Sequence, residues 1–225
     1  MGRSKKTAVG LLAQIVIIWI VLFLGWGLDD LAGFFAHPAR AGLLGVFLLG
    51  TALVLGWRLD VQVFRKGQRP VGRQRWLLPA LLAIGVSLIW FLAYGDRRGL
   101  LTFTDADALR WAGLVLYAGA SAVALVALRT LGKHYSGYVT IQEDHQLVQS
   151  GIYGVIRHPI YLRGLLVMVG LPLIFRSWLV FPMVVCFALF VAARIRQEEK
   201  LLGETFGAEF DAYRRRTWRL LPYLY

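Results

Sequence analysis

The chain has 225 residues, of which 58% are hydrophobic and 17% are charged, and its mean hydropathy is +0.60. About a quarter of the residues of an ordinary soluble domain are charged, so this composition excludes that class and predicts an integral membrane protein. The chain contains one cysteine, Cys186, which excludes an internal disulfide, a cysteine-rich zinc site and an iron–sulfur cluster. The formal net charge is +12. We assign it to the membrane surface and expect no nucleic-acid partner.

Six apolar segments of helical length follow one another along the chain. They are residues 8–28, 41–57, 76–94, 111–128, 160–175 and 178–193. The first is followed by Asp29 and Asp30 rather than by a small-residue cleavage site, so we interpret it as an anchor and not as a signal peptide. The last two are separated by Arg176 and Ser177, which predicts a tight helical hairpin. The sequence therefore predicts an all-α integral membrane protein with about six transmembrane segments and a C-terminal helical hairpin.

Lysine and arginine are divided unequally between the two sides of the membrane that this order of segments defines. The N-terminus, the loop 58–75, the stretch 129–163 and the C-terminal tail share one side and hold 20 of the 25 cations, which leaves 5 for the other side. The positive-inside rule places the richer side in the cytosol. Both termini are therefore predicted to be cytosolic.

Hydrophobicity falls after the fourth segment. Residues 129–159 are too polar to span a membrane and too rich in aromatic and β-branched side chains to be a simple linker, which predicts a folded cytosolic element. Residues 194–213 carry apolar side chains at helical spacing and predict an amphipathic helix that extends the sixth segment. We therefore expect one membrane domain with a four-helix part, residues 1–128, and a second part, residues 129–225.

Two motifs in the second part match a known family. The first consists of Arg157, His158, Pro159 and Tyr161, and the second of Arg194, Ile195, Glu198, Glu199, Leu202, Phe206, Gly207 and Tyr213. In this order, on either side of the hairpin, they resemble the C-terminal pattern of the isoprenylcysteine carboxyl methyltransferases and, more loosely, of the phospholipid N-methyltransferases. The chain departs from that pattern at Arg163, where glycine is usual, and at Thr205 and Phe210. The resemblance covers residues 129–222 and makes the second part a methyltransferase motif region.

The resemblance implies a cytosolic site for S-adenosylmethionine between the polar element and the hairpin. No Gly-x-Gly-x-x-Gly motif of a Rossmann domain follows a strand in this sequence. The cofactor is a zwitterion, and we expect Glu198 or Glu199 to bind its ammonium group through a charge-assisted hydrogen bond. The other candidates for cofactor binding are Gln146, Leu147, Val148, Gln149, Tyr153, His158 and Tyr161.

A carboxylate is the methyl acceptor that suits these residues best. With a reference pKa of about 4 it is ionised at neutral pH and needs no general base, whereas an amine or a thiol does. The resemblance implies that arginines at the positions of Arg129 and Arg194 hold the substrate, and the planar guanidinium fits a carboxylate bidentately. The catalytic candidates are therefore Arg129, Arg194 and Glu198.

Each candidate also fits a purely structural interpretation. Arg129 ends an apolar segment, where arginines commonly extend to the lipid headgroups. Arg194 and Glu198 are four residues apart on one helix, and such a surface pair is worth about 0.3–0.5 kcal/mol. His158 and Pro159 together are a common helix-start signal. It is the combination of the motifs that favours the functional interpretation.

The sequence therefore predicts a membrane methyltransferase that uses S-adenosylmethionine and has its active site on the cytosolic side. Carboxyl O-methylation of an isoprenylcysteine-like or other lipid-borne carboxylate ranks first, and phospholipid N-methylation or small-thiol S-methylation are the alternatives. We expect the lipid or prenylated substrate to enter from the bilayer, and the run 214–216 to contact anionic lipid headgroups.

Two other classes of protein were weighed against the enzyme. A transporter is disfavoured because the apolar segments carry essentially no ionisable residues away from their ends. A non-catalytic membrane scaffold or sensor is the alternative that stays open. We predict no metal site, since His37 has no second histidine near it on its side of the membrane.

Overall fold

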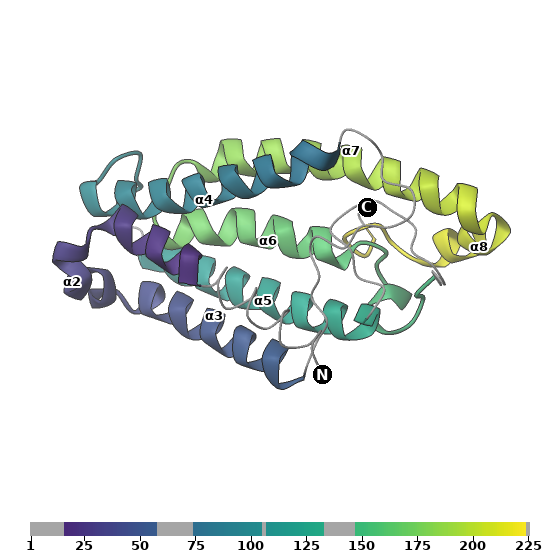
Figure 1. The fold of residues 1–225 in the computed structure, drawn as a ribbon, viewed down its shortest axis with the longest axis horizontal. Helices are drawn as coiled ribbons and strands as arrows, with labels where there is room; N and C mark the ends of the chain where they lie inside the picture. Colours follow the sequence, from purple (N-terminus) through teal and green to yellow (C-terminus); the bar gives the residue numbers. More distant parts are fainter. Residues whose placement is uncertain (1–15, 58–73, 105–106, 133–146, 224–225) are drawn as a thin grey trace.

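The computed structural model describes residues 16–57, 74–104, 107–132 and 147–223, which form a bundle of long helices (Figure 1). Within these ranges the backbone forms helices and two isolated β-bridges, and no strand. The prediction of an all-α fold is confirmed for this part of the chain. Gln146, one of the predicted cofactor-binding residues, lies outside it.

The long helices reproduce the predicted order of apolar segments, because each of the six segments overlaps one helix. An N-terminal helix, Val16–Trp26, comes first. It is followed by η1 (Leu28–Asp30), α2 (Leu31–Ala36), α3 (Pro38–Gly56), α4 (Gln74–Arg98), α5 (Asp107–Leu131), η3 (Gly151–Gly154), α6 (Pro159–Ile174), α7 (Val180–Phe206) and α8 (Ala208–Arg216).

Three of the described helices, α3, α5 and α7, are long and apolar enough to cross a bilayer. The N-terminal helix and the segment Leu28–Ala36 pass the same test as a pair bent by 81°. The bend lies at Gly27, whose φ of +109° is accessible to glycine at little cost. These helices support an integral membrane protein with three to four spans, and the number of six stays a prediction.

Helices α5 and α6 pack closely because glycines face each other across their contact. A Cβ atom on Gly113 would lie 2.6 Å from the carbonyl oxygen of Gly170, and one on Gly170 would lie 2.8 Å from that of Gly113. Small residues permit this close approach of backbones in membrane proteins. The two glycines therefore join the four-helix part to the second part of the chain.

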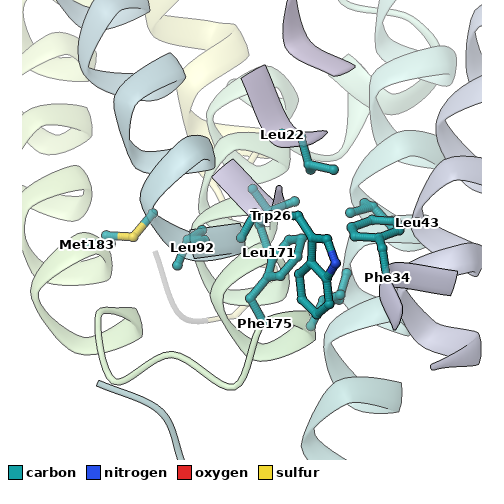
Figure 2. Close-up of a cluster of buried hydrophobic side chains, with 10 residues drawn as sticks. Leu22, Trp26, Phe34, Leu43, Leu92, Leu171, Phe175 and Met183 are labelled. Carbon is teal, nitrogen blue, oxygen red and sulfur yellow. The ribbon is translucent and has the colours of Figure 1, made fainter. Parts of the chain in front are cut away.

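A cluster of buried apolar side chains fastens the remaining helices to this pair (Figure 2). Phe34 of α2 and Phe175, just after α6, are completely buried and lie at its centre. The other labelled members are Leu22, Trp26, Leu43, Leu92, Leu171 and Met183. Because these residues come from both parts of the chain, the parts share one core, as one membrane domain requires.

A buried ionic cluster closes the end of the bundle where α3 and α5 begin and where α4 and α6 end. Asp96, whose side chain is 0% exposed, lies at its centre. Arg40 donates to its Oδ2 at 2.9 Å, and Arg110 and Arg176 each donate to its Oδ1 at 2.8 Å. We refer to these four residues as the Asp96 cluster.

The predicted amphipathic helix 194–213 is two helices, which corrects the sequence interpretation. Helix α7 continues without a break to Phe206, and α8 starts again at Ala208. Gly207 between them has a φ of +50°, a backbone conformation that glycine adopts at little cost. Phe210 of α8 then lies 3.8 Å from the Cβ position of Gly203, so α8 folds back against the end of α7.

Candidate functional site

Four segments meet at the end of the bundle opposite the Asp96 cluster, toward the right of Figure 1. They are the loop 147–158, the first turn of α6, the polar part of α7 after Ala193 and the C-terminal segment 217–220. Helix α6 begins with Pro159 at a position where proline is favoured, and His158 is its N-cap residue. The first family motif therefore lies at the start of a helix, as expected.

The C-terminal segment is hydrogen-bonded along the loop that precedes α6. The backbone N–H groups of Arg157 and His158 donate to the carbonyls of Trp218 and Arg219, at 2.7 and 3.0 Å. The N–H of Trp218 donates in turn to the carbonyl of Val155 at 2.9 Å. These bonds fix the two segments side by side and hold His158 between the segment and α7.

Glu199 of α7 is buried under this pair of segments, with 7% of its side chain exposed. Its Oε1 accepts a hydrogen bond from Nε of Arg157 at 3.0 Å and lies 3.4 Å from Nε2 of His158. Its Oε2 accepts from Nε of Arg219 at 3.0 Å and lies 2.9 Å from Nη2 of the same side chain. Both carboxylate oxygens are thus bound by groups of the protein itself.

The charge of Glu199 depends on these partners. Burial raises its pKa, but hydrogen bonds from His158, Arg219 and Arg157 outweigh burial and hold the pKa at about 2. The carboxylate is therefore ionised at neutral pH, although it lies in the protein interior, because its charge is compensated locally. This setting is that of a structural ion network, and it leaves the side chain little capacity to bind a ligand.

Glu198, the neighbouring residue, has a different setting. Its side chain is 34% exposed, and its Oε2 lies 3.9 Å from Nδ1 of His158. The hydroxyl of Tyr161 donates to the same oxygen at 2.9 Å. Arg194, one turn earlier on α7, also interacts with the Tyr161 hydroxyl. The structure therefore brings together a partly exposed carboxylate, an imidazole, a phenol and a guanidinium.

Three further predicted cofactor-binding residues lie at the start of the loop 147–158. Leu147 and Val148 are partly buried. The side chain of Gln149 donates to Glu209 at 2.8 Å and also accepts from Arg216. Gln149 is therefore engaged by α8 on its outer side.

Tyr153 is a packing residue at this end of the bundle, with 8% exposure. Its carbonyl accepts a hydrogen bond from the hydroxyl of Tyr213 at 2.8 Å. Burial raises the pKa of Tyr213 to about 12, which keeps this hydroxyl protonated and able to donate. The pair fastens α8 to η3 beneath the loop.

Arg129 and Arg194 lie in different settings. Arg194 stands beside Tyr161 and Glu198, as the site hypothesis expects. The guanidinium of Arg129 lies 5.0 Å from the ring centroid of Trp57, at the end of α3, in a cation–π contact. A joint action of the two arginines on one substrate stays a prediction, and Arg194 is the better placed of the two.

Arg163, which stands where the family pattern has glycine, is exposed. Its guanidinium lies close enough to Tyr117 of α5 for an electrostatic interaction. The adjacent Gly164 instead faces Phe187 of α7, since a Cβ there would lie 2.5 Å from the ring. The arginine therefore lies on a different side of α6 from the glycine that contacts α7.

Sequence reasoning missed two residues of this site, Thr217 and Arg219, and gave no role to Arg157. Arg157 Nη1 donates to the hydroxyl of Thr217 at 3.1 Å and to the carbonyl of Arg214 at 3.1 Å. The first motif contains Arg157, so that signal was available. Arg219 belongs to a basic tail without a periodic pattern, and nothing in the sequence marks it.

The described residues contain no group of three or more histidine, cysteine, aspartate or glutamate side chains that could hold a metal ion. His37 instead caps α3 by accepting the N–H of Ala39 at Nδ1, 3.1 Å away. Its Nε2 lies 2.9 Å from Asp107. The two ring nitrogens thus serve a helix cap and a surface pair.

One family model and several known proteins are similar to this chain. Residues 108–209 match the model of a family described as phospholipid methyltransferase. The chain is 35% identical over 141 residues to the cobalt-zinc-cadmium resistance protein CzcN of Cupriavidus metallidurans, an alignment that covers 58% of this chain and 63% of that protein. It is 34% identical over 106 residues to the protein-S-isoprenylcysteine O-methyltransferase of Saccharomyces cerevisiae, covering 44% of this chain and 43% of that enzyme. The chain thus spans less than two thirds of the length of either relative.

A solved structure shares the fold over a longer range. The eukaryotic intramembrane Ras methyltransferase ICMT (isoprenylcysteine carboxyl methyltransferase) superposes with a TM-score of 0.56 at 20% sequence identity. The superposition covers 92% of this chain and 74% of that one. The likeness therefore extends beyond the matched motifs to most of the helical bundle.

Proposed function

We propose that this chain is a membrane methyltransferase of the isoprenylcysteine carboxyl methyltransferase kind, which takes its methyl group from S-adenosylmethionine. The observation that carries the proposal is the setting of Glu198. It is a partly exposed carboxylate that shares a contact shell with Tyr161, His158 and Arg194. Glu199 beside it is fully occupied by structural partners.

The residues present fit this cofactor by the chemistry of their donors. An α-amino acid group needs an anion for its ammonium and a donor for its carboxylate, and the site has Glu198 for the first and His158 for the second. Tyr161 offers an aromatic ring, and Leu147 and Val148 offer apolar side chains. When bound, the cofactor supplies an electrophilic methyl group on a sulfonium.

The protein's part in the reaction is positioning. Methyl transfer is an in-line displacement, and holding two reactants in line can replace several kcal/mol of barrier, up to about 7–11 kcal/mol in well-oriented systems. Glu198 orients one reactant, and Arg194 is placed to orient a carboxylate on the other. The hydroxyl of Tyr161 contacts both side chains.

We rank a lipid-borne carboxylate, such as that of an isoprenylcysteine, first among the acceptors. Arg194 favours an anionic substrate, and a carboxylate is already ionised at neutral pH and needs no general base. The alternatives are the phospholipid amine named in the family's description and a small thiol. A scaffold or sensor without catalysis is the remaining alternative. We expect a lipid or prenylated substrate to enter from the bilayer and the site to face the cytosol.

Calorimetry with S-adenosylmethionine and the detergent-purified protein tests the proposal. We expect saturable binding by the wild type and an affinity at least about 10-fold lower for Glu198→Gln, because a charge-assisted hydrogen bond contributes about 1.5–3 kcal/mol. The matched control is Glu204→Gln on the same helix, whose side chain is 62% exposed and pairs with Lys200. The assignment fails if the wild type does not bind, or if both variants bind as the wild type does.

A further inference from the structure

The C-terminal segment 217–220 is bound on two sides. Its backbone pairs with the loop before α6, and Trp218 and Ile156 form a parallel β-bridge there. On the other side, Leu220 packs against Val191 and Ile195 of α7. The segment therefore lies between the two elements that carry the family motifs, and it contacts both of them.

Arg219 makes the polar contact of this segment with α7. Nε and Nη2 of its guanidinium both lie at Oε2 of Glu199, at 3.0 and 2.9 Å. The other oxygen of the same carboxylate, Oε1, faces Arg157 and His158. The two oxygens of one carboxylate thus bind different segments, the C-terminal segment and the loop that holds His158.

These contacts of Glu199 determine the position of the His158 side chain. The imidazole is 4% exposed and faces both carboxylates, with Nε2 toward Glu199 and Nδ1 toward Glu198. If Arg219 no longer held Oε2, the carboxylate of Glu199 could rotate about its terminal torsion, which has a broad energy minimum. His158 would then lose its fixed neighbour on the Nε2 side.

We propose that Arg219 is a positioning residue of the methyltransferase site, which holds Glu199 so that His158 keeps its place beside Glu198. The inference rests on the proposed function and extends it to a residue outside both motifs. Arg219 contacts Oε2 of Glu199, whereas Arg157 and His158 face Oε1. It acts through Glu199.

The fold of the segment does not depend on this side chain. Arg157 separately bonds the carbonyl of Arg214 and the hydroxyl of Thr217, and the backbone bridge at Trp218 uses no side chain. Arg219 is also 34% exposed, so water can replace part of what a substitution removes. We therefore expect its removal to change the site more than the stability.

Three variants test the proposal, each measured for S-adenosylmethionine affinity by calorimetry, for thermal unfolding, and for KM toward a farnesylated N-acetylcysteine. Arg219→Gln should bind the cofactor about 10-fold more weakly, with the KM within twofold and the unfolding temperature close to wild type. Arg219→Lys should recover most of the affinity, because an ammonium group can still donate to Oε2. Arg215→Gln, at an exposed position of α8, is the matched control and should match the wild type throughout.

The double variant Glu199→Gln with Arg219→Gln tests whether Arg219 acts through Glu199. If it does, the double variant binds the cofactor no more weakly than Glu199→Gln alone, since residues in one network are not additive. Additive losses, an Arg219→Gln affinity equal to wild type, or a loss of unfolding temperature that parallels the loss of affinity would each overturn the proposal. A wild type that does not bind S-adenosylmethionine would instead overturn the proposed function.

Discussion

The bundle carries a buried carboxylate network at each end, and the two networks differ in what they leave open. Around Asp96, three arginines surround one carboxylate that is 0% exposed. Around Glu199, two arginines and a histidine surround a carboxylate that is 7% exposed, but Glu198 beside it is 34% exposed. One network is closed, and the other adjoins a carboxylate that a ligand can reach.

The closed network balances its charge with backbone groups. Arg40 donates to the carbonyls of Gly33 and Phe34, near the end of α2, at 2.8 Å each, and Arg110 donates to the carbonyl of Ile174, the last residue of α6, at 2.6 Å. The last carbonyls of a helix carry partial negative charge, which offsets the excess of arginine over carboxylate. This end of the bundle therefore has the character of a structural joint.

The two ends of the bundle also differ in their cations, five of which the positive-inside rule assigns to the non-cytosolic side. All five have a recorded partner among the described residues: Arg40, Arg110 and Arg176 at Asp96, Arg97 at Asp29, and Arg98 over the ring of Tyr94. At the other end, Arg194 lies beside Tyr161 and the partly exposed Glu198. The charges of one end hold helices together, whereas those of the other end include groups suited to substrates.

The largest effect is expected at the closed network. Asp96→Asn leaves two buried guanidinium groups, Arg40 and Arg110, and the partly exposed Arg176 without a carboxylate, and breaking a buried pair in this way costs about 3–5 kcal/mol. Thermal unfolding and size-exclusion chromatography in detergent should show a large loss of folded protein. Asp29→Asn is the matched control, because that aspartate is exposed and pairs with Arg97 at the surface. Equal stability of the two variants would contradict a structural role for Asp96.

The next effect separates the two adjacent glutamates. Glu199→Gln should destabilise the protein by about 3 kcal/mol, the low end for a broken buried pair, since Arg219 can regain water. Glu198→Gln should change the unfolding free energy by less than about 1 kcal/mol, because its side chain is partly exposed. Thermal unfolding of both variants in the same detergent makes the measurement. The division of roles between the glutamates fails if their order is reversed.

A third prediction separates the two arginines. Arg194→Leu should leave cofactor affinity within a few-fold and lower methyl transfer about 100-fold, or about 2.7 kcal/mol, because it removes the orientation of the acceptor. Arg129→Leu should lower transfer less, since its guanidinium lies over Trp57. Turnover of a farnesylated cysteine by the two purified variants measures this. A larger loss for Arg129→Leu would restore the equal clamp expected from the sequence.

The smallest effect is the one that reports topology. After Cys186→Ser, single cysteines are placed at positions 149 and 37, and thermal unfolding is measured first because His37 caps α3. A membrane-impermeant thiol reagent should reach position 149 only from the cytosolic side and position 37 only from the other. The reverse pattern would remove the cytosolic placement of the site, while leaving the site itself intact.

Hydropathy and motif order were sufficient to predict the all-α fold, the order of the helices and the similarity to membrane methyltransferases over residues 108–209. Segment lengths carry that information because a bilayer imposes them. The break at Gly207 was missed, since Phe210 and Tyr213 continue the helical spacing across it while the φ of the glycine reverses the chain. Periodicity alone does not distinguish a continuous helix from one folded back on itself.

The different roles of Glu198 and Glu199 were also beyond the sequence. The two residues are adjacent and chemically identical, and only the contacts of Arg157 and Arg219, from distant segments, distinguish them. The Asp96 cluster was missed for a related reason. Its arginines stand at the ends of separate apolar segments, where each one alone has an ordinary interpretation as an interfacial residue.

Transfer of a labelled methyl group is the most direct test of the account. Membranes or proteoliposomes containing the wild type or Glu198→Gln would receive S-adenosylmethionine labelled on its methyl group, together with a farnesylated N-acetylcysteine. The account predicts that the wild type forms a base-labile product that releases methanol, and that the variant forms at least about 10-fold less at a cofactor concentration below the dissociation constant. Base-stable label in phospholipid headgroups would favour the amine acceptor instead. An absence of transfer to any lipid by folded, membrane-inserted wild type would contradict the enzymatic role.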